Sequence, residues 1–173
     1  LKESDKQQIN RWLKDAGKVA ILTHTNPDGD AIGSSLALAL ALRKKGLDAQ
    51  VVIPDGLPDF LRWLPGISYS TTFAYKREKA STIIREADVV FCLDFNDRQR
   101  LNGVEEVLAE SKAPSILIDH HQDPQVFTDM TISESWRGSV GEMIYVLLEQ
   151  LYGREHLDRD IATCLYVAIM TDT

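Results

Sequence analysis

Apolar positions follow two patterns along the chain, and segments of the two kinds alternate. Short uninterrupted apolar runs are typical of strands buried on both faces of a sheet. They cover residues 19–23, 49–53, 89–93 and 115–118. Longer segments repeat apolar residues at the spacing of a helix. They cover residues 5–16, 31–45, 76–86, 104–110, 140–151 and 159–170, with a short helical turn at 60–64.

This alternation predicts an α/β fold, in which a doubly wound, mostly parallel sheet carries helices on both faces. The segment 31–45 is apolar nearly all round, so we expect a helix that is buried on most sides. Two polar residues stand directly before predicted helices, Ser139 before 140–151 and Asp158 before 159–170. Serine and aspartate are favoured N-caps, so we expect both to cap their helices.

Composition narrows the class of protein. The chain has 173 residues, enough for one substantial domain, and a net charge of −7. An acidic chain argues against a broad nucleic-acid or membrane surface, but a small phosphate site remains compatible with it. No apolar run approaches the roughly 20 residues of a membrane span. Cys92 and Cys164 lie in apolar runs and are expected to be reduced core residues, which favours a cytoplasmic protein.

Candidate chemistry begins in the turn at residues 24–30, between the first strand and the long apolar helix. His24, Asp28 and Asp30 place one imidazole and two carboxylates within seven residues. Such groups suit divalent cations that carry phosphates. Gly29 separates the two aspartates, and we expect it to bend the backbone so that they reach neighbouring ions. The alternative is that Asp28 simply caps the following helix.

Further groups of the same kind follow other predicted strands. Asp94 comes after the third strand, and Asp119, His120 and His121 come after the fourth. Ligands of open parallel sheets bind at the carboxyl ends of the strands, so these groups should meet at one edge. Asp172, after the last helix, could join them. A single aspartate at a strand end is most often a turn former, but the whole set at element ends is much harder to explain in that way.

Five carboxylates crowded together would repel one another and take up protons, and two divalent cations would relieve that repulsion. A mixed set of histidine and aspartate fits Mn²⁺, Fe²⁺ or Zn²⁺ better than an all-oxygen Mg²⁺ or Ca²⁺ site. Such a pair of ions could clamp a phosphate and present a hydroxide in line with the leaving oxygen. Asp94 is suited by residue type to bridge the two ions.

Four motifs, taken in order, resemble those of the DHH phosphoesterase superfamily. They are H-x-x-x-D-G-D-A-I-G-S at 24–34, Asp94, D-H-H at 119–121 and T-D-T at 171–173. The subgroup that the chain resembles is that of bacterial oligoribonucleases (nanoRNases) and 3′-phosphoadenosine 5′-phosphate phosphatases, often labelled exopolyphosphatase-related. The resemblance implies two Mn²⁺ ions. It implies that His24 and Asp28 hold one ion, that Asp30, His120 and Asp172 hold the second, and that Asp94 bridges both.

The resemblance also implies catalytic roles for two residues. His121 would contact the scissile phosphate or assist the leaving group, and Asp119 would orient its neighbours. Arg100 matches the pattern that follows the second motif, and it would be structural or face the phosphate of the substrate. A surface salt bridge is an equally good interpretation of Arg100, and Arg98 is a competing candidate.

The resemblance implies a metal-dependent phosphoesterase that hydrolyses short oligoribonucleotides, linear dinucleotides or 3′-phosphoadenosine 5′-phosphate. Alternatives are a pyrophosphatase or exopolyphosphatase with the same metal chemistry, and a nucleotide-binding module without catalysis. The Gly-Gly-Gly-His loop of the subgroup's C-terminal DHH-associated domain does not occur in the sequence. We therefore expect residues 1–173 to be a DHH catalytic domain truncated after the fourth motif. The resemblance also suggests a homodimer.

Overall fold

A six-stranded sheet with the strand order β3-β2-β1-β4-β5-β6 forms the centre of the computed structural model, which describes all 173 residues. Every neighbouring pair of strands is parallel. The predicted α/β fold is therefore confirmed. The strands are β1 (Lys18–Leu22), β2 (Asp48–Ile53), β3 (Ser70–Thr72), β4 (Val89–Leu93), β5 (Ser115–Asp119) and β6 (Met130–Ser133).

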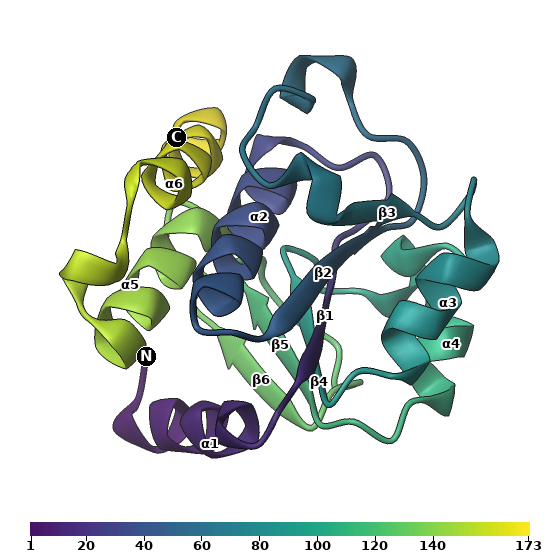
Figure 1. Ribbon diagram of the computed structural model, residues 1–173, viewed down its shortest axis with the longest axis horizontal. Coiled ribbons are helices and arrows are strands. Elements are labelled where there is room, and N and C mark those ends of the chain that lie inside the picture. Colours follow the sequence, from purple (N-terminus) through teal and green to yellow (C-terminus); the bar gives the residue numbers. More distant parts are fainter.

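Helices cover both faces of the sheet (Figure 1). One layer holds α1, α2, α5 and α6, whose apolar residues share a core cluster, and α3 and α4 contribute to the core on the other face. The α-helices are α1 (Glu3–Lys14), α2 (Gly29–Lys44), α3 (Arg77–Arg85), α4 (Val104–Glu110), α5 (Val140–Tyr152) and α6 (Arg159–Asp172). None of these helices combines the length and apolar character that crossing a membrane requires.

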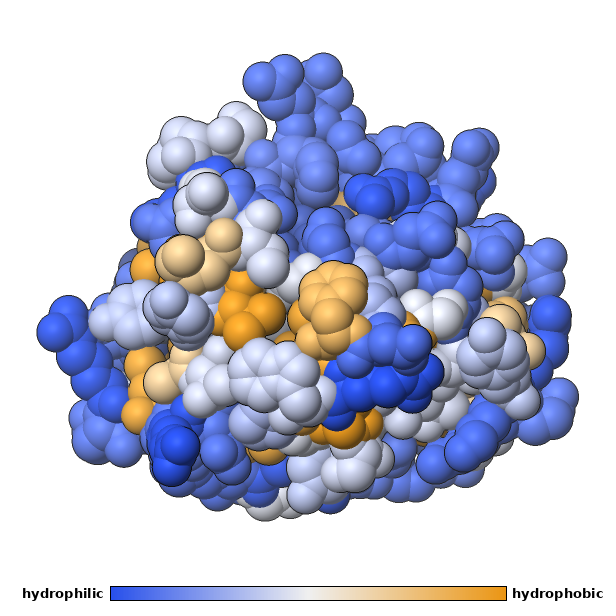
Figure 2. Space-filling model, turned by 90° about the horizontal axis from the view of Figure 1, so that it is seen from above, coloured by the Kyte–Doolittle hydropathy of each residue, from blue (hydrophilic) through white to orange (hydrophobic).

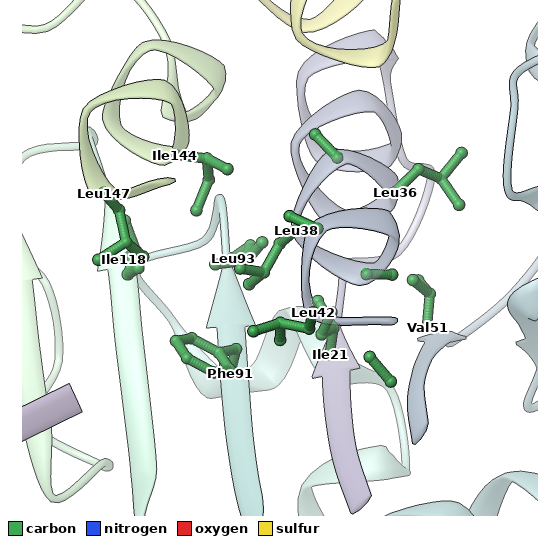
Figure 3. Close-up of a cluster of buried hydrophobic side chains, with 14 of the residues drawn as sticks. Ile21, Leu36, Leu38, Leu42, Val51, Phe91, Leu93, Ile118, Ile144 and Leu147 are labelled. Carbon is green, nitrogen blue, oxygen red and sulfur yellow. The ribbon is translucent and has the colours of Figure 1, made fainter. Parts of the chain in front are cut away.

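The larger core lies between the sheet and the layer that contains α2 and α5. Figure 3 shows side chains from both, with Leu38 and Leu42 of α2 and Ile144 of α5 directed toward Phe91 and Leu93 on β4. Burial of such side chains is worth about 1.5–3 kcal/mol each. This core fixes α2 and α5 against the middle of the sheet, and α6 packs on both helices.

Two strands, β3 and β6, were not predicted from the sequence, and both lie at the edges of the sheet. β3 is only three residues long and reads Ser-Thr-Thr, while β6 reads Met-Thr-Ile-Ser, with only Ile132 buried. Edge strands need not be apolar on both faces, so the search for uninterrupted apolar runs could not find them. The four predicted strands form the centre of the sheet in the order β2-β1-β4-β5.

Other expectations from the sequence are met by the structure. Ser139 caps α5, since its hydroxyl accepts a hydrogen bond from the amide of Glu142, and Asp158 caps α6 by accepting from the amide of Ile161. Cys92 and Cys164 are both free and buried. Burial raises the pKa of the Cys92 thiol and raises the pKa of Cys164 to about 12, so both remain protonated at neutral pH.

Candidate metal centre

The predicted site residues meet at the carboxyl edge of the sheet. β1, β4 and β5 are neighbours, and the groups that follow or end them are His24, Asp94 and the segment 119–121. The start of α2 and the end of α6 lie at the same end of the molecule in Figure 1. Three overlapping groups of ligand atoms result, in each of which all atoms lie within 4.8 Å of one another. They are His24/Asp28/Asp94, Asp30/His120/Asp172 and Asp94/His120/His121.

The first group lies at the start of α2. The Nε2 atom of His24 is 3.6 Å from Oδ2 of Asp94, and its Nδ1 atom is 2.7 Å from the carbonyl oxygen of Thr25. The tautomer with its proton on Nδ1 can donate to this carbonyl, and it is the one that would leave the Nε2 lone pair available to a cation beside Asp94. Asp28 does cap α2, because its Oδ1 accepts from the amide of Ala31 at 3.0 Å. Capping occupies one oxygen, and the other remains available for a cation.

The second group surrounds the Nε2 atom of His120. This atom lies 3.2 Å from Oδ2 of Asp172, 3.5 Å from Oδ1 of Asp94 and 3.9 Å from Oδ2 of Asp30. The Nδ1 atom of His120 is 3.2 Å from the carbonyl oxygen of Arg137. Ligands bound about 2.1 Å from a common cation are themselves about 3.0–3.4 Å apart. The observed separations are therefore close to those that one cation would draw together.

Asp94 belongs to two of the three groups, and two of its features indicate a functional position. Its backbone has φ +69°, in the left-handed region that only a few residues other than glycine adopt. Its Oδ1 atom is buried and has no hydrogen-bond partner. A buried carboxylate oxygen without a partner is costly in a folded protein, and a bound cation would supply the missing interaction.

The pKa values in the site reflect the crowding of charge. Burial and then the neighbouring Asp94 carboxylate raise the pKa of Asp30 to about 8, and the same two causes raise the pKa of Asp172. Burial opposes ionisation of Asp94 too, but the adjacent imidazoles of His120 and His24 lower its pKa. Asp94 in turn raises the pKa of His120 to about 9. The site thus favours added positive charge, as two cations would provide.

Asp119 contacts His121, one of the neighbours that the family resemblance implies it orients. The Oδ1 atom of the fully buried Asp119 lies 2.7 Å from Nδ1 of His121, and this contact is the first cause of the raised pKa of His121. The same Nδ1 atom is 3.9 Å from Oδ1 of Asp94. The ring is partly exposed and borders the metal-type cluster, so it can reach a molecule bound there.

Arg100 lies beside the first group. Its Nη2 atom is 2.9 Å from Nδ1 of His24, and its carbonyl oxygen accepts a hydrogen bond from the amide of Thr25 at 2.8 Å. Arg100 forms none of the ion pairs of the structure, so the alternative interpretation of Arg100 as part of a surface salt bridge is wrong. Arg98 instead lines a separate hollow with Phe127 and Asp129.

The predicted role of Gly29 as a backbone bend is wrong. Gly29 is the first residue of α2 and is not among the residues with positive φ. A Cβ atom at this position would lie 2.5 Å from the side chain of Thr171. Glycine is therefore required because α6 approaches the start of α2 closely, and that approach brings Asp172 near Asp28, the N-cap of α2, and near Asp30 in its first turn.

Sequence reasoning missed the groups that hold Asp30. Its two carboxylate oxygens accept hydrogen bonds from the amides of Val140 and Gly141, at 2.7 and 2.8 Å. Backbone donors leave little trace in a sequence. The only signal was the pattern Ser139-x-x-Glu142, which marks the start of a helix and so a set of free amides.

The face of the molecule at the upper end of Figure 1 is mostly hydrophilic, with apolar side chains gathered in a limited area (Figure 2). Aromatic residues are among the exposed large side chains of the protein. They are Phe60, Trp63, Tyr75, Trp136 and Tyr166. A polar face of this kind is suited to a polar or charged ligand rather than to an apolar one.

Comparisons with known proteins agree with the geometry. A family model described as the DHH family, N-terminal domain, matches residues 18–169. The chain is 32% identical over 157 residues to the bifunctional oligoribonuclease and PAP phosphatase NrnA of Thermus thermophilus, covering 91% of this chain and 44% of that protein. It is 28% identical over 165 residues to a probable manganese-dependent inorganic pyrophosphatase of Bacillus licheniformis, covering 90% of this chain and 48% of that protein.

A solved structure is also closely similar. An exopolyphosphatase-related protein from Bacteroides fragilis matches with a TM-score of 0.97 and 35% sequence identity, covering 99% of this chain and 51% of that one. The chain therefore spans about half the length of the relatives that it matches. The resemblance to the DHH superfamily and to its oligoribonuclease subgroup, stated from the sequence, is confirmed.

Proposed function

Since this chain belongs to the DHH family, we propose that it carries the metal centre of a divalent-metal-dependent phosphoesterase. Its substrates would be short oligoribonucleotides, linear dinucleotides or 3′-phosphoadenosine 5′-phosphate. The observation that carries this proposal is the set of overlapping donor groups around Asp94, whose Oδ1 atom is buried without a hydrogen-bond partner. The substrate class is supported by the similarity to NrnA.

The donor set fits two Mn²⁺ ions, because nitrogen and oxygen ligands are mixed and the groups share one carboxylate. We assign His24 and Asp28 to one ion and Asp94 to both. The second ion would be held by Asp30, His120 and Asp172. The name of the Bacillus licheniformis relative, a probable manganese-dependent pyrophosphatase, supports the choice of metal.

Bound cations would lower the pKa of a water molecule and neutralise charge on the phosphate. The chain's own residues supply orientation and proton transfer. His121 is fixed through Nδ1 by the carboxylate of Asp119, which also raises its pKa. In its protonated form the ring would donate a hydrogen bond from Nε2 to the phosphate or to the leaving oxygen. The guanidinium of Arg100, next to His24, supplies a fixed positive charge for a phosphate oxygen.

Hydrolysis of a diadenylate in the presence of Mn²⁺ tests the proposal. We expect Asp94→Asn to lower kcat/KM at least about 100-fold, because the shared carboxylate is lost from both metal groups. Glu78→Gln is the matched control, since Glu78 is exposed on α3 and takes part in no ion pair. An Asp94→Asn protein that is folded and as active as the control would contradict the proposal.

A pyrophosphatase or exopolyphosphatase is the second candidate, and the similarity to the pyrophosphatase of Bacillus licheniformis favours it. The metal groups would be the same, and only the substrate would differ. Parallel assays with pyrophosphate, tripolyphosphate and a diadenylate distinguish the two. A nucleotide enzyme should prefer the diadenylate and be inhibited by adenosine phosphates, whereas a pyrophosphatase should prefer the inorganic substrates.

A further inference from the structure

The connection between β6 and α5, together with the first turn of α5, contacts two members of the second metal group, the fully buried Asp30 and the partly buried His120. We propose that this segment, residues 134–141, is a positioning element that sets the geometry of Asp30 and His120. It thereby sets the affinity of the Asp30/His120/Asp172 group for a divalent cation. The inference rests on the proposed function only in assuming that this group binds a cation.

Asp30 is held entirely by the start of α5. Its Oδ2 accepts from the amide of Val140 and its Oδ1 from the amide of Gly141, and the side chain is fully buried. These are the free amides of a 13-residue helix, so the helix dipole adds to the two hydrogen bonds. Both oxygens are thereby fixed in direction, and Oδ2 faces Nε2 of His120 at 3.9 Å.

The same segment orients His120 through a carbonyl group. The carbonyl oxygen of Arg137 is 3.2 Å from Nδ1 of His120 and can accept a hydrogen bond from an Nδ1–H group. When a cation replaces the proton on Nε2, that tautomer would leave the Nε2 lone pair free to bind it beside the carboxylates of Asp94 and Asp172. Partners that fix a ligand histidine in this way commonly decide its orientation and basicity.

Ion pairs brace the segment itself. The guanidinium of Arg137 bonds Glu134 and Glu142, both at 2.9 Å, and the second oxygen of Glu142 accepts from the amide of Gly138 at 3.2 Å. The amide of Glu134 donates to the carbonyl oxygen of Asp119 at 3.1 Å. The segment is thus tied both to β5 and to the first turn of α5, which makes it a stiff support.

Gly141 is needed for this arrangement on steric grounds. A Cβ atom at this position would lie 2.5 Å from Cβ of Ala168 on α6 and 3.3 Å from Oδ1 of Asp30. Any side chain here would therefore push α5 away from α6 and from the carboxylate. The small residue brings the amides of α5 within hydrogen-bonding distance of Asp30.

The substitution Val140→Pro tests the proposal by removing one donor to Asp30. It also places the proline Cδ atom in the direction in which this amide now reaches Oδ2 at 2.7 Å, so the carboxylate has to move. Val140 is the first residue of α5, where proline is well tolerated, and Ser139 before it is extended with φ −161° and ψ 161°, as a residue before proline should be. The control is Arg159→Pro, at the equivalent first position of α6. Its preceding residue is also extended, and the amide of Arg159 forms no hydrogen bond.

The readout is the affinity of each Mn²⁺ site, measured by calorimetric titration of the metal-free protein with Mn²⁺. We expect Val140→Pro to weaken one Mn²⁺ site about 10- to 100-fold and to leave the other within about twofold, whereas Arg159→Pro changes neither. If both sites of a folded Val140→Pro protein keep their affinity, or both weaken equally, the proposal is wrong. Binding of two ions without hydrolysis of any phosphoester would count against the proposed function alone.

Arg137→Met keeps the test decisive if Val140→Pro fails to fold by circular dichroism. This change retains an apolar stem and removes both ion pairs that brace the segment. The positioning role predicts a severalfold loss of affinity at the same single site, with far-ultraviolet dichroism unchanged. Unaltered affinity in a folded Arg137→Met protein would then overturn the proposal.

Discussion

At the scale of single residues, the site depends on how side chains of opposite charge are held around Asp94. The sequence was sufficient to predict which residues lie together, because histidine and aspartate at the ends of neighbouring parallel strands meet at one edge. It was not sufficient to show what fixes them. The partners of Asp30 and His120 are backbone amides and a carbonyl group, which every residue carries and which no sequence pattern distinguishes.

Gly29 was expected from the sequence to bend the backbone, but the structure gives it a steric role against Thr171. We expect Gly29→Ala to lower the Mn²⁺ affinity and to destabilise the protein by about 1–3 kcal/mol, because the added methyl group would lie 2.5 Å from Thr171. The second change Thr171→Gly should restore much of both losses. Calorimetric Mn²⁺ titration and urea unfolding are the measurements.

Gly56→Ala is the matched control for that experiment, since nothing lies within 4 Å of a Cβ atom at Gly56. If Gly29 acted by bending the backbone, Thr171→Gly would give no rescue. Equal losses in the single and the double variant would therefore contradict the steric account.

At the scale of elements, the sequence predicted every α-helix and the four central strands, because buried elements carry clear apolar patterns. It failed at β3 and β6, where one side of the strand faces no neighbour. The sequence indicated that Asp172 could join the site, but it did not show how α6 comes close enough to α2. That helix reaches the site because Gly33 of α2 allows close contact, with a Cβ position only 2.5 Å from the carbonyl oxygen of Cys164.

The N-cap of α6, Asp158, is predicted to stabilise that helix in a pH-dependent way. The hydrogen bond from the amide of Ile161 is the first cause of the lowered pKa of Asp158, and Lys44 on α2 lowers it further. A lowered pKa in the folded state means that the stabilisation is present above the unfolded pKa of about 3.9. It is lost as the pH falls through the folded value.

We therefore expect Asp158→Ala to reduce the free energy of unfolding by about 0.5–1 kcal/mol at pH 7, a modest value because the side chain is half exposed. The difference from the unaltered protein should shrink toward zero as the pH falls below the folded pKa. Urea unfolding at a series of pH values measures this. A difference that stays constant down to pH 2 would show that the carboxylate charge is not the cause.

At the scale of the whole molecule, the α/β fold brings four separate parts of the chain to the carboxyl edge of the sheet. The turn before α2, the ends of β4 and β5, and the end of α6 all contribute ligand-type atoms. The family follows from this arrangement and from the match over residues 18–169. The homodimer, the cytoplasmic location and the assignment of residues 1–173 to one catalytic domain stay predictions.

The central claim is that two divalent cations bind side by side and share Asp94. Anomalous diffraction from crystals grown with Mn²⁺ tests it most directly. We predict two peaks about 3.5–4 Å apart, one beside His24 and Asp28, the other beside Asp30, His120 and Asp172, with Asp94 between them. A single peak, or peaks that do not border Asp94, would contradict the account.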